Sequence, residues 1–196
     1  MNASFPPTRI ADHPIDPQFL NRWSPRAFDA STLTDAAMLS LLEAARWAPS
    51  ASNNQPWRFV WALRGEPGFD AIAASLVPAN HVWAHKASGL IVIASKTTTP
   101  RDGVEHPNSY HAFDAGAAWA QLGLQAHLNG LSAHAMAGFD ADKLSENIAL
   151  PTNHALHAVV AIGRQGDPTT LPEALQPREA PNGRIPLSAV AHRGTF

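Results

Sequence analysis

Apolar residues recur at helical spacing over residues 35–47. The residues that share one face of this segment are Met38, Leu41, Leu42 and Ala45. Thr34 precedes the segment and can cap its first turn, and Pro49 follows it, where a helix cannot continue. The pattern therefore predicts a helix from Asp35 to Trp47.

Short apolar segments elsewhere have the composition of strands. They are residues 57–63, 90–95, 131–136 and 155–163. The second is almost entirely apolar, which is typical of a strand covered on both faces. Helical pieces are expected around residues 70–76 and 82–86, and a short helix is expected to begin at Asp140. Residues 97–109 are rich in threonine, proline and glycine and are expected to form a loop.

The longest predicted helix spans His111 to Leu128, and Gly130 is placed for a left-handed C-terminal cap. One face of this helix carries Phe113, Ala117, Ala120, Leu124 and Leu128. Small residues crowd its first half, from Ala115 to Ala118. We expect this small-residue face to allow close packing against a second copy of the same helix.

The two ends of the chain are poor in helix and strand patterns. Residues 1–17 contain four prolines and are expected to form an extended arm. From about residue 164 the chain is proline-rich and irregular, and such a tail is expected to wrap over another surface. Because helices and strands alternate between these ends, residues 18–196 are predicted to be one layered α+β domain that includes the tail.

Composition and charge exclude several classes of function. Fourteen Lys and Arg residues against sixteen Asp and Glu residues give a net charge of −2, so no nucleic-acid partner is expected. No apolar run approaches the roughly 20 residues that a membrane-spanning helix needs. Charged residues make up only 15% of the chain and apolar residues 45%, which favours a surface buried against another subunit.

The chain has no cysteine. This excludes disulfides, thiolate catalysis, cysteine-held iron–sulfur clusters and thiolate zinc sites, and it is consistent with a reducing cytoplasm. Residues 1–17 show no basic segment followed by an apolar stretch, so no signal peptide is expected. The protein is predicted to be soluble and cytoplasmic.

The first segment that suits a bound ligand is Arg22-Trp23-Ser24-Pro25-Arg26-Ala27-Phe28. Two arginines and one hydroxyl lie within five residues of each other. Arginine binds phosphate through forked hydrogen bonds, and serine adds a neutral donor. The alternative interpretation is a solvated surface turn.

A second candidate segment runs from Pro49 to Trp57. It contains two serines, two asparagines and a glutamine between prolines. These side chains offer donors and acceptors without net charge, which suits the edge of a heterocycle such as the pyrimidine end of a flavin. The alternative is a loop whose serines and asparagines form turns.

A third candidate combines Asp114-Ala-Gly116, at the start of the long helix, with Met136-Ala137-Gly138-Phe139. Gly138 is expected to let the backbone approach a flat ring closely. Ordinary core packing is the alternative for each of these pieces.

In their order and spacing, these segments resemble the nitroreductase family of flavoproteins. The family's Arg-x-Ser-x-Arg-x-Phe element is matched from Arg22 to Phe28, and its Asn-x-Gln-Pro-Trp element from Asn53 to Trp57. The match also includes Glu43-Ala-Ala-Arg46-Trp47-Ala-Pro49-Ser50, Asp114-x-Gly116, Gly130-Leu131, Gly138-Phe139 and the strand ending at Gly163. It covers about residues 18–190. Pro25 and Asn54 depart from the family pattern without breaking the site.

The resemblance implies a layered sheet with flanking helices, in an intertwined homodimer with a C-terminal extension. It also implies FMN, bound without a covalent link between the two subunits. Arg22, Trp23 and Ser24 would lie at its phosphate and ribityl chain, and Arg26 nearer the N1–C2 carbonyl edge. The residues expected to hold the ribityl chain and ring from the opposing segment, partly across the dimer, are Ser50, Ala51, Ser52, Asn53 and Gln55.

Two further contacts are implied by the resemblance. Backbone from Met136, Ala137 and Gly138 would lie near flavin N5. Arg184 would close on the phosphate, in competition with three other late arginines, which are Arg164, Arg178 and Arg193.

The family's activity implies an oxidoreductase that takes hydride from NAD(P)H and reduces nitroaromatics, quinones or similar electron-poor molecules by a ping-pong mechanism. The chemistry would take place on FMN N5, with no catalytic side chain, and the short segment 97–109 implies a small active-site lid. One alternative is an FMN-binding protein that stores or senses flavin. Another is a metal-dependent hydrolase, but the histidine pairs 81/85 and 154/157 lack carboxylates to complete a site, so no metal is expected.

Overall fold

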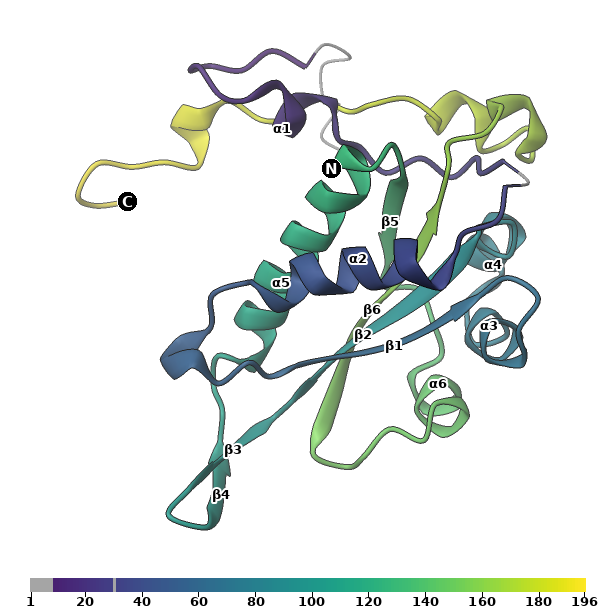
Figure 1. Cartoon of the computed structure of the whole chain (residues 1–196). Coiled ribbons are helices and arrows are strands. Elements are labelled where there is room, and N and C mark those ends of the chain that lie inside the picture. The colour runs from purple at the N-terminus through teal and green to yellow at the C-terminus, as the bar shows by residue number, and fades with distance from the viewer. Residues whose placement is uncertain (1–8, 30) are drawn as a thin grey trace.

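The computed structural model describes residues 9–29 and 31–196 (Figure 1). At its centre is a four-stranded antiparallel sheet with the strand order β1-β2-β6-β5. These strands are β1 (Trp57–Leu63), β2 (Gly89–Lys96), β6 (His154–Gly163) and β5 (Ser132–Met136). Strands β2 and β6 are therefore central, and β1 and β5 form the two edges.

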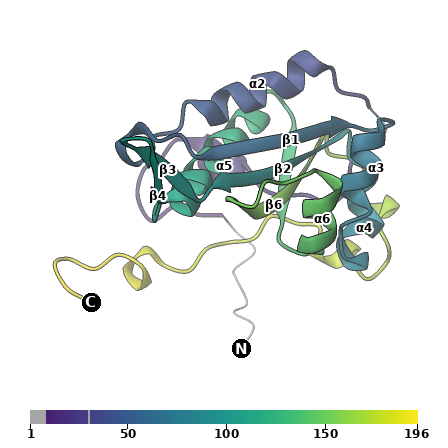
Figure 2. The same ribbon diagram turned by 90° about the horizontal axis from the view of Figure 1, so that it is seen from below.

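Helices cover both faces of this sheet (Figures 1 and 2). Side chains alternate along β2, so that Leu90 and Val92 pack on one face and Ile91 and Ile93 on the other, all at most 2% exposed. The helices on the Ile91 face are α2 (Asp35–Arg46) and α5 (His111–Leu128). Those on the Leu90 face are α3 (Pro67–Ala73), α4 (Pro78–Ala84) and α6 (Ala141–Asn147). The predicted α+β class and the strand covered on both faces are both confirmed.

Capping follows the sequence signals closely. The Thr34 hydroxyl accepts a hydrogen bond from Ala37 N at 3.2 Å, and the Asp140 side chain caps α6 through Lys143 N. Helix α5 has the predicted bounds, and Gly130 beyond its end has a φ of +69°. This left-handed conformation is the one that favours glycine after a helix.

The prediction of a loop over residues 97–109 is wrong. Strands β3 (Thr98–Arg101) and β4 (Val104–Pro107) form a hairpin there, which projects from the body of the molecule (Figure 1). Asp102 and Gly103 form its two-residue turn, with φ of +51° and +79°. An Asp-Gly pair between strands is a strong hairpin signal, and threonine favours strands. The sequence of residues 97–109 therefore does indicate a hairpin.

Two smaller predictions are also corrected. A short helix, α1 (Pro17–Asn21), begins at the last residue of the predicted arm and is capped by the Asp16 side chain; residues 1–8 of that arm lie outside the described residues. In α5 the buried face contains Asp114, Ala115, Ala118, Leu122 and Ala126. The face predicted to be apolar points outward in the single chain, with Phe113 78% and Leu128 64% exposed.

The C-terminal tail has two parts. Its first part returns over the domain, where Leu171 and Glu179 are buried, and includes the 3-10 turns η2 (Pro168–Thr170) and η3 (Gln176–Arg178). Its last part, with η4 (Leu187–Ala189), passes α1 and runs away from the body (Figure 1). Several apolar side chains there are exposed, including Ile185, Leu187 and Val190. Among the described helices, none is long and apolar enough to cross a membrane.

Candidate functional site

Arginines from three separate segments lie close together beside α1. Arg22 follows α1 as its C-terminal cap, Arg9 comes from the N-terminal arm and Arg184 from the tail. Arg9 ties these segments together, because its Nη1 donates to the carbonyls of Leu20 (2.6 Å) and Arg22 (2.7 Å) and its Nε to that of Asn182 (2.9 Å). Sequence analysis identified Arg22 and Arg184 but missed Arg9.

The three arginines form a cationic cluster. Burial lowers the pKa of both Arg9 and Arg22, and repulsion from Arg184 lowers both further. Within residues 9–29 and 31–196, neither Arg9 nor Arg22 forms an ion pair with a carboxylate. Positive charge that is partly buried without a counterion favours the binding of an anion, and arginine suits a phosphate.

The other late arginines lie elsewhere. Arg164 lies near Gly130, Arg178 is exposed beside Arg26, and Arg193 is exposed near the end of the tail. Of the four late arginines, Arg184 is the one whose charge lowers the pKa of Arg22; its contact with a phosphate stays a prediction.

Arg22 and Ser24 border a pocket of about 440 Å³ between α1, α5 and β5. Its other lining residues are Phe19, Trp119, Ala120, Gly123, Leu124, His134 and Ala135. Arg22 Nη1 donates to Ser24 Oγ at 3.3 Å. The volume lies within the range of roughly 300–1,000 Å³ that small-molecule sites occupy. An aromatic wall next to two polar groups suits a flat ligand with an anionic end.

Arg26, the second arginine of the motif, has a different environment. Its Nη1 lies 3.6 Å from Oε2 of Glu179 and donates to the Arg178 carbonyl at 3.3 Å. Burial lowers the pKa of Arg26, Arg178 lowers it further and Glu179 raises it. Arg26 thus has a carboxylate partner, whereas Arg22 has none among the described residues.

Two residues distant in sequence bind the backbone of the motif that runs from Arg22 to Phe28. Glu179 Oε1 accepts from the backbone N–H groups of Arg26 (2.6 Å) and Ala27 (2.8 Å). His134 Nδ1 donates to the Pro25 carbonyl at 2.9 Å, and burial is the main reason why the pKa of His134 is lowered. Sequence analysis missed both residues because each acts across more than 100 positions of the chain.

The loop after α2 has a strained backbone. Ser52, Asn53 and Gln55 have φ of +51°, +53° and +47°, a region that non-glycine residues rarely adopt. Such strain persists where surrounding contacts impose it, and it is often found at binding sites. Here the Ser50 hydroxyl accepts from Gln55 N at 3.0 Å.

Contacts from outside the loop hold it in place. Both Asp114 carboxylate oxygens lie 3.3 Å from Ala51 N, which donates to them, and Asp114 is only 2% exposed. The Asn54 Oδ1 accepts from Thr99 Oγ1 at 3.1 Å, which links the loop to the β3–β4 hairpin. These bonds give a structural role to Asp114, which belongs to the Asp-x-Gly motif, and to Asn54, which departs from the family pattern.

Helix α5 separates the loop from the arginine cluster. The loop is fixed at Asp114 in the first turn, whereas Arg22 packs against Gly123 in the second half. Nine residues of α-helix span about 14 Å. The structure therefore brings Arg22, Ser24 and Arg184 together but leaves Ser50, Ala51, Ser52, Asn53 and Gln55 at the other end of α5 (Figure 1).

Gly138 is explained by packing in the single chain. Its carbonyl accepts from Val77 N at 3.2 Å and from Asn80 Nδ2 at 3.0 Å. A Cβ atom at this position would lie 2.7 Å from Asn80 Nδ2 and 2.9 Å from Val77 Cγ2, so a larger residue would displace these side chains. Met136 is buried and Ala137 is exposed. Contact of this segment with a flat ring stays a prediction.

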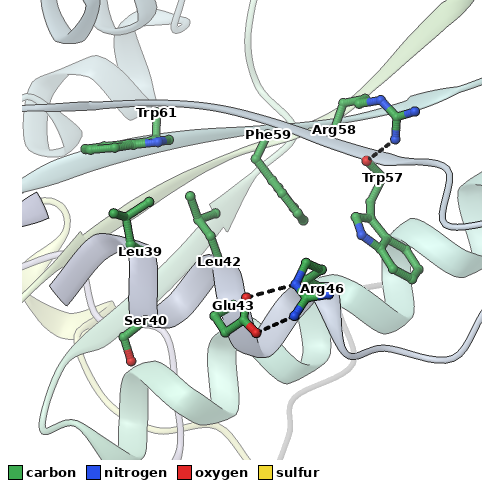
Figure 3. A pocket seen from close by; sticks show the side chains of 9 residues that line it. All are labelled: Leu39, Ser40, Leu42, Glu43, Arg46, Trp57, Arg58, Phe59 and Trp61. Carbon is green, nitrogen blue, oxygen red and sulfur yellow. Dashed lines mark hydrogen bonds and ion pairs between the residues drawn. The ribbon is translucent and has the colours of Figure 1, made fainter. Parts of the chain in front are cut away.

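A second hollow lies at the opposite edge of the sheet, between α2 and β1 (Figure 3). This groove of about 650 Å³ is lined by Leu39, Ser40, Leu42, Glu43, Arg46, Trp57, Arg58, Phe59 and Trp61. Hydrogen bonds from Arg46 and Trp47 lower the pKa of Glu43 to about 2, so Arg46 is already paired with a carboxylate. The groove is a mostly apolar surface, and its second arginine, Arg58, donates to the carbonyls of Gln55 (3.0 Å) and Trp57 (2.7 Å).

The histidine pairs considered as metal ligands have other partners. His85 Nδ1 donates to the His81 carbonyl at 2.7 Å. His157 Nε2 lies 2.6 Å from the Ser95 hydroxyl, whose other neighbour is His111 Nδ1 at 2.7 Å. Among the residues that the structure describes, no three His, Asp or Glu side chains are grouped as metal ligands.

The chain folds as a layered α+β domain, and Arg22 and Ser24 border a pocket at its surface. Residues 20–164 match the model of the nitroreductase family, and the chain belongs to this family. An uncharacterised 15.4 kDa protein from Mycolicibacterium smegmatis is 37% identical over 147 residues, which cover 71% of this chain and 97% of that protein. The resemblance identified from the motifs is confirmed.

Solved structures support the same assignment. A structure described as an oxidoreductase containing FMN is 44% identical, with a TM-score of 0.94 and 97% of each chain covered. A putative nitroreductase from Desulfovibrio desulfuricans, solved in complex with FMN, is 26% identical with a TM-score of 0.71; 95% of this chain and 99% of that chain are covered.

Replacing Asp114 by Asn should loosen the strained loop. The loss of a charged acceptor for Ala51 N–H is expected to lower the free energy of unfolding by about 1–2 kcal/mol and to speed amide exchange at Ala51. Asp142→Asn, which also lies in the first turn of a helix, α6, but is exposed, is the control. Urea unfolding and hydrogen exchange measure both effects; equal behaviour of the two variants would contradict the anchoring role.

Proposed function

We propose that this protein is an FMN-dependent oxidoreductase that takes hydride from NAD(P)H and reduces nitroaromatics, quinones or similar electron-poor molecules by a ping-pong mechanism. The observation that carries the proposal is the cluster of Arg9, Arg22 and Arg184, which adjoins the pocket and forms no ion pair with a carboxylate in the part of the chain that the structure describes. FMN combines a flat ring with a phosphate dianion, and a relative at 44% identity contains it. NAD(P)H as donor implies action in the cytoplasm.

The residues present fit this cofactor. Arg22 and Arg184 would bind the phosphate, Arg9 would hold both segments through their carbonyls, and Trp23 and Ser24 would lie at the ribityl chain. Arg26 would lie at the N1–C2 edge, and Met136, Ala137 and Gly138 near N5. When bound, FMN supplies the hydride-accepting centre. The protein's part is to bind and orient the ring, so no nucleophilic side chain is required.

We further infer a homodimer, because one chain cannot assemble all the predicted contacts. The Ser50–Gln55 loop lies at the far end of α5 from Arg22, so a second copy would supply it. Three apolar surfaces could be covered by that copy: the outer face of α5 with Phe113, the groove at β1, and the tail beyond Arg184. Their exposure favours association.

The spectrum of the purified protein tests the function. We expect about one FMN per subunit, all released by acid precipitation, because no cysteine is available for a thioether link. Anaerobic NADH or NADPH should bleach the flavin absorbance, and menadione should restore it. Recovery of FAD or of no flavin would contradict the cofactor, whereas FMN that NAD(P)H does not reduce would indicate a storage or sensing protein.

Arg22→Ala should weaken FMN binding more than Arg178→Ala does. A hydrogen bond between a charged donor and phosphate contributes about 1.5–3 kcal/mol, so the dissociation constant should rise roughly tenfold to a hundredfold. Arg178 is exposed, and its backbone carbonyl, which a substitution keeps, makes the bond to Arg26. Flavin titration of the two apoproteins measures the difference. Equal losses would count against the phosphate site.

Phe113→Glu should weaken the dimer by about tenfold or more, since an exposed aromatic residue at the centre of an interface contributes about 2 kcal/mol or more. Val82→Glu, on α4 at the opposite face of the sheet, is the control. Sedimentation measures the dissociation constants, and removal of FMN should lower the melting temperature of the wild type. A stable monomer with full flavin and activity would refute the shared site.

A further inference from the structure

The side chain of Glu179 is completely buried beside the candidate site. It belongs to the irregular tail, yet its side chain is 0% exposed. Oε1 accepts from two backbone N–H groups, and Oε2 has no hydrogen-bond donor but lies 3.6 Å from Arg26 Nη1. Burying a carboxylate costs free energy unless hydrogen bonds and a cation compensate it.

Holding the backbone does not require this negative charge. A glutamine carbonyl could accept the same two hydrogen bonds from Arg26 N and Ala27 N. The charge instead acts on the Arg26 guanidinium, whose pKa Glu179 raises. Together, Arg26 and Glu179 form a nearly neutral pair.

Three other charged or titratable groups lie near this pair. Arg178 lowers the pKa of Arg26, but its side chain is exposed, so solvent screens it. His134 faces both members of the pair, but its lowered pKa keeps it uncharged at neutral pH. Arg22 belongs to the separate cluster with Arg9 and Arg184.

We propose that Glu179 is a positioning residue that orients Arg26 and offsets its charge at the flavin ring, and thereby lowers the reduction potential of bound FMN. This inference rests on the proposed function. Two-electron reduction of a flavin places negative charge at N1–C2=O, so an unpaired cation there favours the reduced form. A paired arginine keeps the hydrogen-bond donor but adds less net charge, which leaves the reduced flavin a stronger donor to substrates.

Reduction potentials of the FMN-loaded variants test this proposal. Glu179→Gln should raise the ratio of reduced to oxidised flavin at a fixed ambient potential by about tenfold, which is about 30 mV for a two-electron couple. Arg26→Gln should shift the potential in the opposite direction. Glu173→Gln, at an exposed position of the same tail, should leave it unchanged.

The double variant Arg26→Gln/Glu179→Gln replaces a neutral pair by a neutral pair, and its potential should return close to that of the wild type. If Glu179→Gln alone does not fold, the double variant still tests the proposal, because the double variant leaves no unpaired charge buried and is expected to fold. A double variant whose potential equals that of Arg26→Gln, or a Glu179→Gln potential equal to that of Glu173→Gln, overturns the inference. A wild type without flavin overturns the proposed function instead.

Discussion

The packing of α5 against the central strands keeps the loop after α2 and the Arg22 pocket apart within one chain. Ala115, Ala118 and Ala126 are at most 1% exposed, and these small side chains let the helix lie close to β2 and β6. The first turn then presents Asp114 to the loop after α2, and the second half presents Gly123 to Arg22. Because a helix is rigid along its axis, these two sets of residues stay apart in one chain. The same packing turns Phe113 and Leu128 outward. The packing of α5 therefore both separates the loop after α2 from the Arg22 pocket and exposes an apolar helix face. Both features favour the proposed association with a second copy of the chain.

Most of the fold could be predicted from local patterns. The bounds of α5 and β1 and the caps at Thr34 and Asp140 follow from the spacing of apolar residues and from side chains that cap neighbouring backbone groups. The predictions were wrong where one stretch of sequence fits two kinds of structure. The β3–β4 hairpin has threonine and proline in a stretch that also resembles a loop, and its Asp102-Gly103 turn was overlooked. On α5, apolar residues occupy more than one face, so periodicity alone could not show which face the sheet would bury.

The candidate site was predictable only in part, because its local motifs are held together by distant residues. Arg22, Ser24 and Arg26 lie within five positions and could be recognised as a phosphate motif. Their geometry depends on Arg9, His134 and Glu179, which bind backbone carbonyls and N–H groups of that motif. Such bonds leave no pattern in a single sequence, since any donor or acceptor at the right place would serve. Gly138 illustrates the opposite case: the glycine was recognised, but packing against α4 explains it in the single chain.

The two arginines of the motif differ in environment, and in the proposed site this difference would divide their tasks. A phosphate dianion supplies two negative charges of its own, so the cations that bind it gain most when no carboxylate competes. Neither Arg22 nor Arg184 forms an ion pair with a carboxylate among the described residues. A flavin ring is neutral when oxidised and gains charge only on reduction, so a strong unpaired cation beside it would favour one redox state. Arg26 is paired with a buried carboxylate instead. Because the tail supplies both Arg184 and Glu179, the segment with the least regular structure would set the charge at both ends of the proposed ligand.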